Sequence, residues 1–203
     1  MREETAVNEK FWDLKKSRQD SMINGGLRVF AENGFRHAST DEIVAEASVS
    51  KGLLFHYFYS KTGLYSFLAE YAARFALVEL RSELRKKETL PYFEFERSLT
   101  AAEASAMRKY PYLTLFIKTV ETDGASGEAE KESLELYTGC LKELTGNCIL
   151  PETMTREDAV RISGLLSLYR TDTAESLLRS GNFTPERYAA AVAESISFFE
   201  KFY

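Results

Sequence analysis

The stretch that decides the fold runs from Ser39 to Lys61 and reads STDEIVAEASVSKGLLFHYFYSK. Ser39 is placed to begin a short helix, because Glu42 follows three residues later in the capping-box pattern of a helix start. Apolar residues at helical spacing follow, and a Ser-Val-Ser segment ending at Ser50 then interrupts the run. Ser50 is a candidate N-cap of a second helix. Two short helices joined by a tight turn form a helix-turn-helix, whose second helix can enter a DNA major groove.

The pattern of the second helix divides its residues between a core and an outer face. Leu54 and Phe58 are expected to be buried. The residues expected to face away from that core are Lys51, Gly52, Phe55, His56 and Tyr57. Upstream, apolar residues at positions 23, 27 and 30 predict a buttressing helix over residues 17–33, which Gly34 ends in a left-handed conformation.

The N-terminal segment carries one aromatic pair and a basic cluster. Phe11 and Trp12 are expected to pack on the first helix. Two interpretations remain for the basic residues Lys15, Lys16 and Arg18: plain solvent exposure, or a place near a DNA phosphate.

The remainder of the chain predicts further helices and no strand. The expected helices cover residues 64–87, 91–109, 111–121, 128–145, 155–179 and 184–203, with a loop over 122–127. Ser60, Thr155 and Thr184 are the candidate caps of three of them. The fold class is therefore all-α, with about nine helices. The helix over residues 64–87 is expected to link an N-terminal head to the rest of the protein.

Composition sets the broad class of protein. The 203 residues are 44% hydrophobic and 13% aromatic, which suits one or two folded domains. No apolar run approaches the roughly 20 residues that span a bilayer, and the first residues lack a signal peptide's apolar segment. We therefore expect a cytoplasmic protein without membrane contact. Cys140 and Cys148 are expected to be free thiols in a reducing compartment.

Net charge is distributed unevenly along the chain. The whole chain carries −5, whereas residues 1–65 hold nine basic and nine acidic side chains. Within residues 14–65 the count is seven basic against five acidic, or +2. DNA binding needs a local basic face rather than a basic average, so this balance permits it.

The block from Arg18 to Tyr65 resembles the DNA-binding domain of tetracycline-repressor (TetR) family transcription regulators. The matching landmarks are Phe30-Ala31-Glu32-Asn33-Gly34-Phe35, Thr40-Asp41-Glu42-Ile43, Val49-Ser50-Lys51-Gly52 and Phe55-His56-Tyr57-Phe58-Tyr59-Ser60-Lys61. Four positions depart from the family pattern. Ser48 replaces the usual turn glycine, Gly25-Gly26 replaces alanines of the first helix, and Phe55 replaces a common tyrosine.

The resemblance implies which residues contact DNA. It assigns that role to Thr40, Ser50, Lys51, Gly52, Phe55, His56, Tyr57 and Lys61. In this scheme Thr40 and Lys61 bind backbone phosphates, which fix register, while Lys51, His56 and Tyr57 reach bases or phosphates. The alternatives are helix capping for Thr40, core packing for Phe55, turn chemistry for Gly52 and simple solvent exposure for Lys51.

The resemblance also implies a helical effector-binding and dimerisation domain over residues 64–203, after a DNA-binding domain over residues 1–63 with its core at 17–61. Candidate lining residues of an effector pocket are Tyr71, Phe75, Phe95, Phe116, Tyr137 and Tyr169. Candidate dimer-interface residues are Tyr188, Val192, Ser195, Phe199 and Phe202. For both sets the alternative is packing within the core of a single chain.

Enzymatic and metal-dependent functions have no support in the sequence. The two histidines and two cysteines lack metal-ligand spacing, and no nucleophile elbow, phosphate loop or acid/base pair is present. We expect no metal and no cofactor. The predicted function is a homodimeric repressor, released from a palindromic DNA operator by a small-molecule effector. The alternatives are a helical binding module that acts through a protein partner without DNA affinity, and a helical enzyme.

Overall fold

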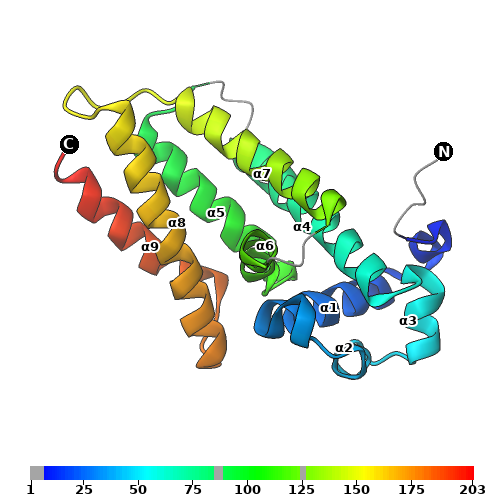
Figure 1. The fold of residues 1–203 in the computed structure, drawn as a ribbon. Coiled ribbons are helices and arrows are strands. Elements are labelled where there is room, and N and C mark those ends of the chain that lie inside the picture. The colour runs from blue at the N-terminus through cyan, green and yellow to red at the C-terminus, as the bar shows by residue number, and fades with distance from the viewer. Residues whose placement is uncertain (1–6, 85–88, 124–126) are drawn as a thin grey trace. The chain divides into compact units, whose positions relative to one another are not determined.

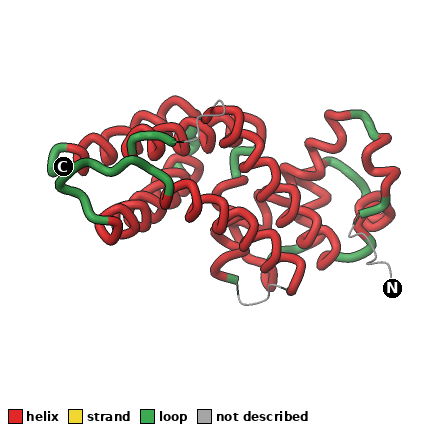
Figure 2. The backbone as a smooth tube through the Cα atoms, turned by 90° about the horizontal axis from the view of Figure 1, so that it is seen from above, coloured by secondary structure: helices red, strands yellow, loops and turns green. Residues whose placement is uncertain are grey.

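The computed structural model describes residues 7–84, 89–123 and 127–203. Within these ranges it contains one 3-10 helix, η1, and nine α-helices, and helix dominates the backbone (Figures 1 and 2). The elements are η1 Glu9–Asp13, α1 Lys16–His37, α2 Thr40–Ala47, α3 Lys51–Phe58, α4 Lys61–Leu84, α5 Tyr92–Lys109, α6 Leu113–Thr122, α7 Glu128–Gly146, α8 Arg156–Arg179 and α9 Pro185–Glu200. The predicted all-α class is confirmed.

Local signals set most helix starts. The hydroxyl of Thr155 accepts a hydrogen bond from the backbone N–H of Asp158, whose carboxylate accepts one from the Thr155 N–H, so α8 begins with a complete capping box. Thr184 caps α9, and Pro185 occupies its first turn, where a missing N–H does no harm. The predicted extension of α4 to Lys87 lies outside the described residues, as do residues 124–126 of the predicted loop over 122–127.

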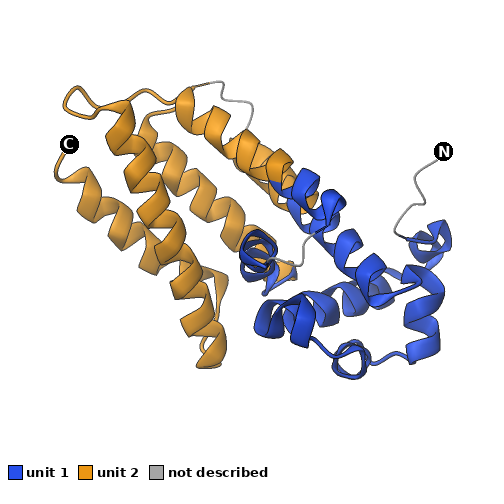
Figure 3. Ribbon diagram, in the orientation of Figure 1, with its two compact units in different colours: residues 1–73, 110–134 blue, residues 74–109, 135–203 orange. Residues whose placement is uncertain are grey.

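The chain divides into two compact units (Figure 3). Unit 1 comprises residues 1–73 and 110–134, and unit 2 comprises residues 74–109 and 135–203. Helices α4 and α7 each contribute residues to both units. The division differs from the boundary at residue 63 expected from the sequence, because α6 belongs to the same unit as the helix-turn-helix. A functional boundary at residue 63 stays a prediction.

Unit 1 is built around an aromatic core against α1. Phe30 packs edge-on against Tyr65 with ring centroids 4.9 Å apart, and Tyr65 packs in turn on Phe116 of α6 at 5.5 Å. At its end, α1 breaks at Gly34, whose φ of +67° confirms the predicted left-handed stop, and a further turn continues to His37. The Phe35 N–H released there donates to the Asp123 carboxylate at the end of α6, at 2.6 Å. Thus α6 holds α1 at the joint that leads into α2.

Unit 2 is an α-helical assembly in which α9 packs on both α5 and α8. The extended segments before α5 and after α7 meet in one isolated parallel bridge between Pro91 and Ile149, the only strand-like pairing among the described residues. The apolar core of unit 2 includes residues from α5, α8 and α9. Among them are Phe95, Leu99, Ile162, Leu166, Val192 and Ile196.

Candidate nucleic-acid interface

Helices α2 and α3 are capped and joined as a helix-turn-helix requires (Figure 1). Ser39 is the N-cap of α2, although its hydroxyl accepts from the Asp41 N–H and not from that of Glu42. The Ser50 hydroxyl accepts from the Leu53 N–H at 3.2 Å and starts α3. Ser48 adopts the left-handed conformation, with φ +53° and ψ +45°. The turn therefore keeps the geometry of a glycine turn and carries a Cβ within it.

The exposed face of α3 holds three of the eight residues expected to contact DNA. Lys51, Gly52 and His56 are exposed, and nothing lies within 4 Å of a Cβ placed on Gly52. Leu54 and Phe58 are fully buried, as predicted. Phe55 is half-buried, so its aromatic ring is divided between the core and the surface. The first turn of α3 thus presents an accessible backbone and a cation to a groove.

Tyr57 does not lie on that face. Its side chain is only 8% exposed, which contradicts the predicted outward orientation. The cause is η1, which folds onto the C-terminal end of α3: Phe11 packs against Tyr57 at 5.8 Å and Phe58 at 5.0 Å. The Asn8 N–H donates to the Tyr57 carbonyl at 2.8 Å. The N-terminal aromatics, expected to pack on the first helix, contact α3 and α4 through Phe11–Phe58 and Trp12–Phe67. The Gln19 side chain of α1 also donates to the Trp12 carbonyl at 3.0 Å.

The cations of the helix-turn-helix are held by weak, exposed contacts. The Lys51 ammonium lies 2.9 Å from the Asp41 carboxylate of α2, and both side chains are largely exposed. Exposed pairs of this kind contribute about 0–1 kcal/mol, so a phosphate can displace Asp41 readily. Lys61 lies over the Phe35 ring at 4.8 Å and donates to the Arg36 carbonyl at 3.4 Å. These contacts hold the Lys51 and Lys61 side chains near their places, but they are weak enough for both side chains to move.

The residues predicted to line one effector pocket are distributed over both units. Tyr71 and Phe116 belong to unit 1, whereas Phe75, Phe95, Tyr137 and Tyr169 belong to unit 2. Phe116 and Phe95 fill the cores of their units, and Tyr169 is exposed. One cavity of about 620 Å³ lies in unit 2 and another of about 330 Å³ in unit 1, and none of the six residues lines either. An effector pocket lined by these residues stays a prediction.

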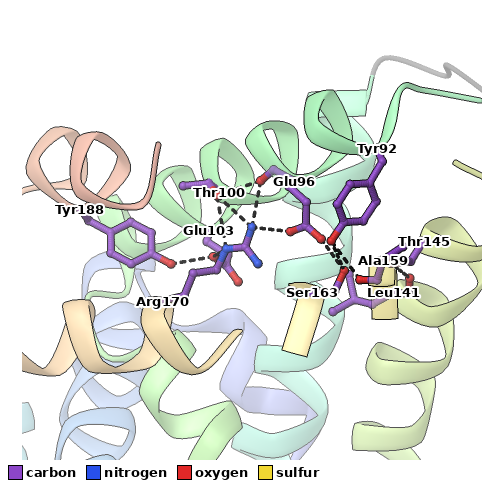
Figure 4. Close-up of polar contacts among 10 residues, drawn as sticks. All are labelled: Tyr92, Glu96, Thr100, Glu103, Leu141, Thr145, Ala159, Ser163, Arg170 and Tyr188. Atoms are coloured by element: carbon purple, nitrogen blue, oxygen red, sulfur yellow. Dashed lines mark hydrogen bonds and ion pairs between the residues drawn. The ribbon is translucent and has the colours of Figure 1, made fainter. Parts of the chain in front are cut away.

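Unit 2 contains a buried charged cluster that the sequence reading missed (Figure 4). Arg170 of α8 donates to the Glu96 carboxylate of α5 at 2.8 Å, and its Nε lies 3.3 Å from Glu103. Tyr188 of α9 donates to Glu103 at 2.6 Å. Burial raises the pKa of Glu103, while Arg170 and the Tyr188 hydroxyl act in the opposite direction. The available signal was an arginine within the apolar stripe of α8, with glutamates on α5 to pair with it.

This cluster corrects the predicted dimer interface. Tyr188 and Val192 are fully buried within the single chain, so they cannot meet a second subunit. Ser195 and Phe199 are half-buried, and Phe202 is exposed. The outward apolar residues of α8 are instead Val160, Leu165 and Leu168, and those at the C-terminal end of α9 are Phe198 and Phe202. The alternative of intramolecular packing is correct for the first two residues.

Neither a metal-binding cluster nor a membrane-crossing helix occurs in the described part of the chain. Residues 7–84, 89–123 and 127–203 contain no cluster of three or more His, Cys, Asp or Glu side chains that could hold a metal ion. None of the described helices combines the length and apolar character that crossing a membrane requires.

Comparisons with known proteins agree with this geometry. Residues 22–66 match the family model described as bacterial regulatory proteins, tetR family. A curated relative from Bacillus subtilis (strain 168), an uncharacterized HTH-type transcriptional regulator called YuxN, is 22% identical over 160 residues. The match covers 76% of this chain and 54% of the relative, so this chain spans about half the length of the curated relative that it matches.

Solved structures share the fold at low identity. A TetR family transcriptional regulator from Chloroflexus aurantiacus J-10-FL has a TM-score of 0.61 at 17% identity, over 96% of this chain and 97% of that chain. The fatty acid degradation regulator FadR from Bacillus halodurans has a TM-score of 0.58 at 20% identity, over 87% and 96%. FadR from Bacillus subtilis, solved in complex with stearoyl-CoA, has a TM-score of 0.55 at 16% identity, over 87% and 96%.

The fold and the matched segment define a helix-turn-helix protein with a helical C-terminal part. Residues 22–66 therefore carry the helix-turn-helix domain that the tetR family model describes, and the chain shares its fold with solved TetR family regulators. The matched family model and these relatives are described as regulatory proteins or transcriptional regulators.

Proposed function

We propose that this protein is a homodimeric transcription repressor that binds a palindromic DNA operator through α3 and is released by a small-molecule effector. The observation that carries the proposal is the exposed start of α3, where Lys51, Gly52 and His56 face outward on a capped helix. A helix with its N-terminal turn free and a cation beside it suits docking in a major groove.

Dimerisation follows from the way a palindrome is read. One head reads few bases, whereas two heads on a two-fold axis, roughly 34 Å apart, match successive major grooves on one face of the duplex. The outward apolar residues of α8 and α9, Val160, Leu165, Leu168 and Phe198, are the surface that we assign to the partner subunit. A four-helix interface from these two helices would bury them.

The effector is proposed to act by population shift. A ligand bound within the helical C-terminal part favours one of two arrangements of the dimer by its differential affinity for them. The aromatic side chains of unit 2, such as Phe75 and Tyr137, favour a largely apolar effector. The stearoyl-CoA complex of Bacillus subtilis FadR supports this class of ligand by analogy of fold.

The test is protection mapping of the DNA upstream of this protein's own gene. We expect the wild-type protein to protect a palindrome. Lys51→Ala should need roughly tenfold more protein, and it should lower the dependence of log K on log salt by about 0.9. The exposed Lys142 of α7 supplies a matched control, and Lys142→Ala should protect like the wild type. Undiminished protection by Lys51→Ala would remove α3 from the interface.

The second candidate is a binding module without DNA affinity, which the pairing of Lys51 with Asp41 and the neutral charge balance of residues 1–65 favour. A mobility-shift titration at low salt separates the two. A partner-only module gives no shift with any duplex, since its contacts to phosphate are absent.

A further inference from the structure

The residue that follows α3 has an unusual backbone. Tyr59 has φ +61° and ψ −45°, and only Ser48 shares a positive φ among the described non-glycine residues. Ser48 lies in the ordinary left-handed region, which small polar residues tolerate. Tyr59 lies outside that region, where a bulky side chain is an outlier. A glycine would take up this conformation without steric conflict, so local folding alone favours glycine at position 59.

The side chain of Tyr59 contributes little to the core. It is 60% exposed, whereas its neighbours Tyr57 and Phe58 are buried beneath η1. The local backbone is nevertheless well bonded: the Tyr59 N–H donates to the Phe55 carbonyl at 2.9 Å, and the Ser60 N–H donates to that of Phe58 at 2.6 Å. The fold therefore holds an aromatic ring outward in a strained position, and such outliers gather at functional sites.

Its neighbours place Tyr59 beside the candidate interface. The exposed His56 precedes it by three residues on α3, and Lys61, the phosphate ligand implied by family resemblance, follows by two. The phenol that the sequence assigned to DNA, that of Tyr57, is packed against Phe11. In the segment from residue 51 to residue 61, the exposed phenol belongs to Tyr59.

We propose that the Tyr59 hydroxyl donates a hydrogen bond to a phosphate oxygen of the operator backbone beside α3. The inference rests on the proposed function and adds a contact that neither the sequence nor the family resemblance assigned. A phenol is a neutral donor, so this contact positions the head without reading bases and without releasing counterions.

The first test compares Tyr59→Phe with the wild-type protein in DNA titrations over a range of salt concentrations. Loss of a donor to a charged oxygen should weaken binding roughly tenfold. The loss should be equal for operator and unrelated duplex, and the salt dependence should not change. Lys61→Ala is the contrasting variant, because removing a cation should lower the slope of log K against log salt by about 0.9.

The second test separates folding from binding. Tyr59→Gly should raise the urea midpoint of unfolding, because strain is relieved, and yet weaken DNA binding at least as much as Tyr59→Phe. Ser48→Gly relieves the other positive φ, and it should raise the midpoint while leaving DNA affinity unchanged. Operator binding by both Tyr59 variants at wild-type strength would overturn the inference and leave the proposed function standing. Failure of the wild-type protein to bind any duplex would overturn both.

Discussion

Gly25 and Gly26 show that the effect of a glycine on stability depends on what surrounds it. In sequence they replace the family's alanines, and a glycine inside an exposed helix destabilises it by roughly 1 kcal/mol. In the structure both are buried, and an ideal Cβ on Gly25 would lie 2.9 Å from the backbone nitrogen of Ala47 in α2. A Cβ on Gly26 would meet side-chain ends only, those of Leu68 at 2.6 Å and Leu64 at 3.7 Å. Gly25 is therefore what lets α1 and α2 approach so closely.

Alanine substitution at a tightly packed glycine and at an open one should change the free energy of unfolding in opposite directions. Gly25→Ala should lower the free energy of unfolding by about 1–3 kcal/mol, because the neighbouring backbone must move. Gly139 of α7 is exposed with nothing within 4 Å of its Cβ position, so Gly139→Ala should raise it by up to about 1 kcal/mol. Urea unfolding of the two variants measures both values. If Gly25→Ala unfolds at the wild-type midpoint, α1 and α2 are less closely packed than described.

At the scale of elements, the sequence predicts where helices begin better than which neighbours cover them. The caps Ser50, Thr155 and Thr184 are local signals between residues three apart, so they survive in the structure. The burial of Tyr57 depends on η1, an element some forty-five residues earlier in the chain. Periodicity marks a face as apolar, and it does not say whether a neighbouring helix or a second subunit covers that face.

The same reasoning explains the errors in the helical C-terminal part. Tyr188 and Val192 lie on the apolar stripe of α9, which faces the core of its own chain. The sequence predicts the helices and the turn of the helix-turn-helix better than the packing of the C-terminal helices, because its landmarks stand at fixed spacing over residues 30–61. The charged cluster of α5 and α8 could not be located, since the partners of Arg170 lie more than sixty residues away in sequence.

The cluster links three elements and carries its own prediction. Arg170→Met should destabilise the protein by about 3–5 kcal/mol, because it leaves the Glu96 and Glu103 carboxylates buried without their cation. Arg161 lies on the exposed side of the same helix, paired with Glu157, so Arg161→Met is the matched control. That control should change stability by less than about 0.5 kcal/mol. Equal stability of the two variants in thermal unfolding would refute the structural role of Arg170.

At the scale of the whole molecule, dimerisation determines whether two heads can act together. The outward apolar side chains of α8 and α9 form a surface that water disfavours, and pairing two copies would cover it. Its residues, Val160, Leu165, Leu168 and Phe198, differ from the stripe expected from the sequence. The homodimer that we propose therefore uses the same two helices, α8 and α9, through these outward residues.

Substitution of Leu168 tests whether the outward apolar residues of α8 and α9 form the subunit contact. Leu168 of α8 is 59% exposed, and Leu168→Glu places a charge within the proposed interface. We expect a shift from dimer to monomer in light scattering after size exclusion, with a loss of operator affinity of at least tenfold, since each head then binds alone. Leu136 of α7 is also exposed, and Leu136→Glu should remain dimeric. A dimer that persists in Leu168→Glu would place the subunit contact elsewhere.

The packing of η1 has one more consequence, which concerns how this protein can be observed. Trp12 is the only tryptophan of the chain, and its ring stacks on Tyr71 with centroids 6.3 Å apart. It is 47% exposed, and its neighbour Phe11 is the residue that covers the end of α3. The Trp12 indole is therefore an intrinsic fluorophore in η1, the element that packs against α3. Its emission wavelength and its quenching by iodide report whether η1 stays packed on α3, without an attached label.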